Sequence, residues 1–105
     1  MKGTIALAAA VVLLAGCAGT PAEQPWSRWT CDSGAELNWR FADAGRDTVD
    51  LRVSGSDVVY RLQREPAASG ALYSDGVIAF HAKGEEGLAY WVAGNDLIGR
   101  GCKAQ

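Results

Sequence analysis

Apolar and polar residues alternate in short segments along most of the chain. The alternation has a period of two over residues 36–41, 48–53 and 58–63, with Leu37 and Trp39 as its first apolar members. This period is typical of a β-strand that buries one face. Clusters of Asp, Ser, Gly and Ala separate the segments, as turns do. The pattern therefore predicts successive short strands.

A β-hairpin is predicted within residues 69–86. Its two strands are joined by Ser74-Asp75-Gly76, a turn that tolerates positive φ. In an antiparallel pair the two outer ends return to the same rim. The loops that begin at Ser69 and Lys83 should therefore lie together, and a hydroxyl and an ammonium group would be presented side by side.

Further strands are predicted over residues 29–31, 88–92 and 96–102, and no helical period of about ten residues or more appears. Eight short strands with short turns favour a small antiparallel β-barrel, closed or nearly closed, and an all-β fold. Its own side chains should fill the interior. The residues expected to point inward are Leu37, Trp39, Phe41, Val49, Leu51, Val53, Val58, Tyr60, Leu62, Ile78, Phe80, Leu88, Tyr90 and Val92. Trp91 is expected to point outward.

Composition limits the protein to one small folded domain. The chain has 105 residues, of which 49% are hydrophobic, and a formal net charge of −2. A mildly acidic chain is a poor partner for nucleic acid, and a cationic protein is a more natural one.

The first 28 residues are interpreted as a signal peptide followed by a tether. Lys2 precedes an apolar run that suits a secretory signal peptide over residues 1–16. The run ends in Leu-Ala-Gly-Cys17, which resembles the bacterial lipobox, where the cysteine carries lipid such as palmitate; the alternative is an ordinary signal with a chance cysteine. Ala18 in place of Asp favours the outer membrane, facing the periplasm. Residues 17–28 would then be the tether and residues 29–105 the barrel.

Two cysteines remain near the two ends of the predicted barrel. Cys31 and Cys102 would lie in an exported, oxidising compartment, where a disulfide bond between them is expected. Two free buried thiols are the alternative.

Several motifs together resemble the bacterial inhibitors of C-type lysozyme, in their membrane-bound lipoprotein form. They are Trp-Thr-Cys-Asp-Ser-Gly at 29–34, Ser-Gly-x-x-Tyr at 69–73, a Lys-Gly element at 83–84, and Cys102. The resemblance implies an eight-stranded barrel with one disulfide that inserts two loops into the active-site cleft of the enzyme. Ser69 and Lys83 would reach the catalytic carboxylates, with Gly70, Tyr73 and Gly84 as further lysozyme-binding residues. For Tyr73, a structural brace at the base of the loop is the favoured alternative to direct contact.

Two positions depart from that family pattern. His81 stands where the family often has Trp, and Gly87 where Ala is usual. A smaller ring and a more flexible residue would leave the Lys83 loop less preorganised.

Other functions find little support in the residues. His81 is the single histidine, so we expect no metal site and no cofactor. Ser69 lies in no nucleophile motif, and we expect no enzyme. A small-ligand-binding barrel and a scaffolding lipoprotein of the envelope remain as alternatives. A large apolar interior cavity would favour the first.

Overall fold

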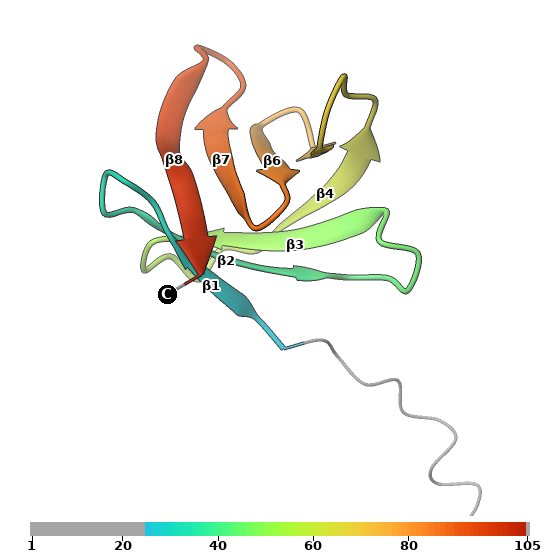
Figure 1. Ribbon diagram of the computed structural model, residues 1–105, viewed down its shortest axis with the longest axis horizontal. Coiled ribbons are helices and arrows are strands. Elements are labelled where there is room, and N and C mark those ends of the chain that lie inside the picture. Colours follow the sequence, from blue (N-terminus) through green and yellow to red (C-terminus); the bar gives the residue numbers. More distant parts are fainter. Residues whose placement is uncertain (1–24, 105) are drawn as a thin grey trace, which may run out of the picture.

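The computed structural model describes residues 25–104 as eight antiparallel β-strands that close into a barrel (Figure 1). Each strand pairs with its neighbours in sequence, and β1 pairs with β8. The strands are β1 (Ser27–Thr30), β2 (Glu36–Phe41), β3 (Thr48–Val53), β4 (Tyr60–Glu65), β5 (Ala71–Ser74), β6 (Ile78–Lys83), β7 (Glu86–Trp91) and β8 (Asp96–Ala104). The predicted eight-stranded barrel is confirmed.

The predicted signal peptide and Cys17 lie outside the described residues. Within residues 25–104 no helix is long and apolar enough to cross a membrane.

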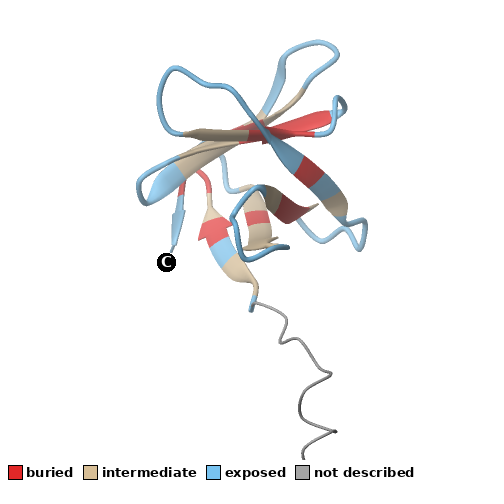
Figure 2. Cartoon of the chain, turned by 90° about the vertical axis from the view of Figure 1, so that its right-hand side faces the viewer, coloured by how far each residue is buried: buried red, intermediate tan, exposed pale blue. Residues whose placement is uncertain are grey.

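The inward faces of the strands form one core, while the connections between strands are exposed (Figure 2). Leu37, Leu51 and Phe80 are fully buried, as the alternation predicted. Aromatic rings gather around Phe80, whose ring centre lies 5.8 Å from that of Trp29 and 5.4 Å from that of Trp39. Side chains thus fill the middle of the barrel.

Two residues predicted to point inward belong to connections instead. Val58 is 52% exposed and Val92 is 36% exposed. Val58 lies before β4, which begins only at Tyr60, and Val92 follows the end of β7. The prediction was wrong because the apolar alternation continues beyond the paired residues.

The predicted orientation of β7 was also wrong. Ala89 is buried and Trp91 packs against the core, whereas Leu88 and Tyr90 do not belong to it. Ala89 pairs with Phe80 across β6 and β7, and residues directly opposite each other share a face. Residues 88–92 are all apolar, so their pattern contains no alternation that could fix the orientation.

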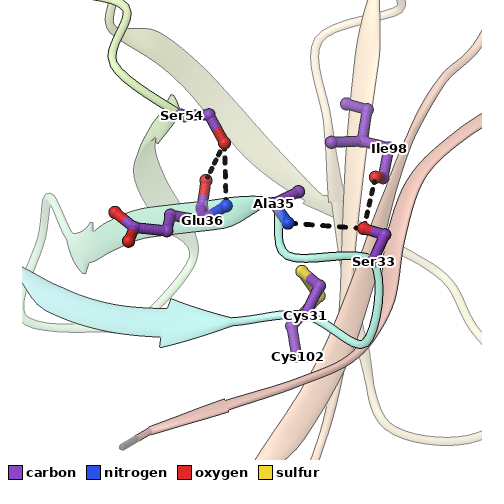
Figure 3. The surroundings of a disulfide bond; sticks show 7 residues. All are labelled: Cys31, Ser33, Ala35, Glu36, Ser54, Ile98 and Cys102. Atoms are coloured by element: carbon purple, nitrogen blue, oxygen red, sulfur yellow. Dashed lines mark hydrogen bonds between the residues drawn. A yellow bond between two sulfur atoms is a disulfide. The ribbon is translucent and has the colours of Figure 1, made fainter.

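The barrel closes where β1 meets β8, next to the disulfide bond. Among the described residues, Trp29 pairs with Ala104 and Thr30 with Lys103 along this seam. The predicted bond between Cys31 and Cys102 is confirmed and links residues 71 positions apart. Figure 3 shows Ser33 beside it, where the Ser33 hydroxyl donates to the Ile98 carbonyl at 3.4 Å. The bond and this contact join the first connection to β8.

Packing against the disulfide requires a glycine in β8. A Cβ atom on Gly99 would lie 2.6 Å from the Cβ of Cys31 and 2.7 Å from its Sγ. Any larger residue at position 99 would collide with the bridge.

The outer face of β3 carries a buried carboxylate. Asp50 is 2% exposed and lies opposite Arg40 on β2 and Arg61 on β4. Arg61 Nε donates to Asp50 Oδ1 at 2.9 Å, and Arg40 Nε donates to Oδ2 at 3.4 Å. The hydrogen bond from Arg61, with further help from its charge and from Arg40, lowers the pKa of Asp50 against the effect of burial.

Trp26 fixes the start of the barrel to this face. The Arg40 guanidinium lies 4.2 Å from the centre of the Trp26 ring, and that of Arg52 lies 5.0 Å from it. Such cation–π contacts stabilise an aromatic side chain at a surface. The chain is therefore held from Trp26 onward, three residues before the predicted start of the barrel at Trp29.

Candidate functional site

The two predicted binding loops lie at the same end of the barrel. Antiparallel strands in sequence order place alternate connections at opposite ends, so the connections 42–47, 66–70 and 84–85 share one end. We call this the mouth end. The pairing of β5 with β6 sets Ala71 opposite Ala82, so Gly70 and Lys83 are the next residues outward on each strand.

A hydrogen bond joins the Ser69 loop to β6, the strand that ends at Lys83. The Nε2 atom of His81, on β6, lies 2.7 Å from the backbone carbonyl oxygen of Ser69. Because the carbonyl only accepts, this nitrogen is the donor. The His81 side chain therefore holds the Ser69 backbone against the strand that ends in Lys83.

Gly70 allows the loops to approach so closely. Its φ is +68°, and a Cβ atom there would lie 2.5 Å from the Ala82 carbonyl oxygen and 2.6 Å from Cγ of Lys83. No other residue fits both the backbone conformation and the space. The stem of Lys83 thus lies beside the Gly70 backbone.

Lys83 lies at the start of a tight turn between β6 and β7. Lys83 pairs with Glu86, and Gly84 has a φ of +64° at the first of two turn positions, as a type II′ turn requires. The Lys83 side chain is exposed and forms no ion pair with any residue between 25 and 104. Its ammonium group is free to meet a partner.

Tyr73 lies beneath these loops rather than on their surface. It is 3% exposed, and its hydroxyl donates to the Arg46 carbonyl at 2.9 Å. Burial raises the pKa of Tyr73, so the hydroxyl stays protonated. Tyr73 therefore braces the 42–47 connection against β5.

Gly87 has a packing role that the sequence does not reveal. A Cβ atom there would lie 2.6 Å from the His81 carbonyl oxygen and 3.1 Å from the Trp29 ring. Gly87 lies within β7 and its φ is not positive. The His81 backbone and the Trp29 indole lie so close to Gly87 that they leave no space for a side chain. This packing explains the glycine, and backbone flexibility at position 87 is not required.

The residues that the structure describes include no cluster of three or more His, Cys, Asp or Glu side chains able to hold a metal ion. The Ser69 hydroxyl has no hydrogen bond to His81, whose Nε2 contacts the Ser69 backbone. The geometry is that of a surface on which the Lys83 ammonium and the Ser69 hydroxyl stand on closely spaced loops.

Comparison with known proteins agrees with this geometry. A family model described as "Membrane-bound lysozyme-inhibitor of c-type lysozyme" matches residues 29–98. The match includes both loops and begins at the first core residue of β1. No curated protein and no solved structure matches the chain.

Proposed function

Because this chain belongs to the family of membrane-bound inhibitors of c-type lysozyme, we propose that it blocks the enzyme by inserting the Ser69 and Lys83 loops into the active-site cleft. The adjacency of these loops, which follows from the pairing of β5 with β6 and is supported by the bond from His81 to Ser69, is the observation that carries the proposal.

The chemistry of the target supports this mechanism. A glycosidase of this kind works with two carboxyl groups that flank the bond to be cleaved. The free ammonium of Lys83 matches a carboxylate in charge, and a charge-assisted hydrogen bond between them is stronger than a neutral one. The Ser69 hydroxyl can donate to the second carboxyl group or accept from it, whichever protonation state that group has.

The shape of the loops supports the same mechanism. Gly70 and Gly84 flank the two side chains and carry no side chains of their own, so the backbones can approach a cleft wall closely. Glu85 and Glu86 are exposed beside Lys83 and suit the basic rim of such an enzyme.

The test is a lysozyme lysis assay with the purified protein. Wild type should inhibit, and Lys83→Ala should weaken inhibition by about 2 to 5 kcal/mol because the enzyme carboxylates are left buried without a counter-charge. Ser69→Ala should cost less, about 0.5 to 1.5 kcal/mol.

Arg100→Ala is the matched control for the lysine variant. It also removes an exposed cation, but its backbone carbonyl accepts from Asp32, in the connection at the opposite end of the barrel. Equal inhibition by wild type and Lys83→Ala would reject the mechanism. Absence of inhibition by the wild type would favour a scaffolding role.

We further propose that Cys17 carries the lipid and holds the protein at the outer membrane, facing the periplasm. The family is membrane-bound, and Cys17 ends the lipobox-like run Leu-Ala-Gly-Cys, so a lipid on this residue is a suitable anchor. Incorporation of labelled palmitate should be lost in Cys17→Ser. Equal labelling of both proteins would rule the site out.

A further inference from the structure

A half-open cavity of about 320 Å³ occupies the mouth end. The rings of Trp39, Phe41 and Phe80 line it. Space remains there because the facing residues of β5 and β6 at this level are only Ala71 and Ala82. The barrel is thus filled in its middle and open at one end.

Two arginines border this cavity. Arg64, on β4, lies opposite Tyr73, whose buried ring marks the inner face, so the Arg64 side chain belongs to the inner face as well. Arg46 reaches the cavity from the 42–47 connection, with its guanidinium 5.4 Å from the centre of the Phe41 ring. Neither arginine forms an ion pair with a carboxylate in the described part of the chain.

Two carboxylates lie on the same connection as Arg46. Asp43 Oδ1 accepts from the backbone amides of Asp47 and Thr48, both at 3.0 Å, and the Asp47 carbonyl accepts from the Arg64 amide at 2.8 Å. Neither carboxylate forms an ion pair with Arg46 or Arg64 in the described part of the chain, so both guanidinium groups can pair with an anion.

Trp39, whose ring lines the cavity, carries a buried donor. Its Nε1 atom has no hydrogen-bond partner among residues 25–104. Buried polar groups are normally paired, so this indole nitrogen is an exception.

We propose that the mouth of the barrel binds a small organic anion, a carboxylate carried on a compact aromatic or branched aliphatic body. The apolar body packs on the rings, and the carboxylate pairs with Arg46 and Arg64. The volume lies at the low end of the roughly 300 to 1,000 Å³ of small-molecule sites, so the ligand is small. This binding requires neither Ser69 nor Lys83, but Gly70, Tyr73 and Gly84 also line the cavity, so the site adjoins the loops proposed to bind lysozyme.

The test is a titration of the purified full chain with naphthalene-2-carboxylate, followed by calorimetry and by NMR of backbone and indole N–H groups. Saturable binding with a dissociation constant of about 1 mM or below is expected for a ligand of this size. The largest shifts should fall on the Trp39 indole and on residues around the mouth. The neutral naphthalene-2-carboxamide should bind at least about tenfold more weakly, because it forms no ion pair.

Variants complete the test. Arg64→Gln and Arg46→Gln should each weaken carboxylate binding about tenfold, and Arg100→Gln should leave it unchanged. Ala82→Leu should abolish carboxylate binding because the larger side chain fills the cavity. If this variant does not fold, the two arginine variants test the proposal. Absence of saturable binding, equal binding of carboxylate and carboxamide, or shifts confined to the outer surface would each overturn the proposal.

Discussion

The side chain of His81 and the backbone of Ser69 form a hydrogen bond, 2.7 Å long, that joins the Ser69 loop to β6. His81 precedes Lys83 by two residues on this strand. One side chain therefore holds the Ser69 backbone against the strand that presents Lys83.

His81→Phe should weaken lysozyme inhibition while the barrel stays folded. Phenylalanine keeps a ring but loses the donor, and one neutral hydrogen bond is worth about 0.5 to 1.5 kcal/mol, or roughly 2- to 10-fold in affinity. His81→Gln retains a donor and should lie closer to wild type. Inhibition titrations with thermal midpoints as control measure this, and identical inhibition by the Phe variant would show that the bond does not order Ser69.

Lys83→Arg should restore only part of the inhibition that Lys83→Ala loses. The charge is kept, but the planar guanidinium is wider than the ammonium and less able to fit the same slot. Inhibition by wild type should also decrease with added salt, since an acidic protein is steered toward a basic enzyme. Titrations at two salt concentrations test both points. Inhibition by the Arg variant as strong as that by wild type, at either salt concentration, would argue against a narrow slot.

Gly87→Ala should lower stability, even though it introduces the residue that is usual in the family. Its methyl group would lie 2.6 Å from the His81 carbonyl oxygen. Relief of this clash requires the backbone of β6 or β7 to move, which costs free energy. Overpacking of this kind costs about 1 to 3 kcal/mol. A thermal midpoint at or above that of wild type would show that β6 and β7 can separate without cost.

Asp50→Asn should destabilise the barrel by about 1 to 3 kcal/mol, because it weakens hydrogen bonds between charged groups at a buried position. Glu36→Gln is the matched control. Glu36 pairs with Arg28 at 3.1 Å, but the Arg28 side chain is 64% exposed, and such surface pairs contribute about 1 kcal/mol or less.

The pH dependence of stability should reveal the same carboxylate. Arg61 lowers the pKa of Asp50 below its usual 3.8, so the stabilisation is complete above that value and decreases as pH falls below it toward the folded pKa. Asp50→Asn should lack this part of the acid dependence. Urea titrations between about pH 2 and pH 5 measure it, and parallel profiles for the two proteins would exclude the role of Asp50.

Removal of the disulfide should lower the thermal midpoint strongly. Closing a loop of 71 residues is worth about 4 kcal/mol in the chain-entropy model, which corresponds to roughly 15 to 30 °C for a domain of this size. The Cys31→Ala, Cys102→Ala double variant and the reduced wild type should agree. A midpoint unchanged in both would mean that the bond adds nothing to stability.

Much of the fold follows from the sequence because period-two alternation is strong in β2, β3 and β4. Where both faces of a strand are apolar, as in β7, only the pairing with β6 decides which side chains point inward. Val58 and Val92 show the same limit at strand ends, where the alternation outlasts the pairing.

The candidate site divides in a similar way. The adjacency of the Ser69 and Lys83 loops follows from hairpin geometry alone. The bond from His81 depends on which atoms meet across the strands, and the burial of Asp50 depends on two arginines from different strands. The local sequence pattern indicates neither the His81 bond nor the burial of Asp50. Arg40, Asp50 and Arg61 are recognised as neighbours only once the strands are paired.

The disulfide also determines how the barrel would respond to mechanical load. A pull that arrives from the residues before Ser27 acts first on β1, a strand of four residues. Stripping this strand from β2 and β8 must stop at Cys31, because its sulfur is covalently joined to β8. The connections that carry Ser69 and Lys83 lie within the covalent loop, so tension can remove the first strand without unravelling them.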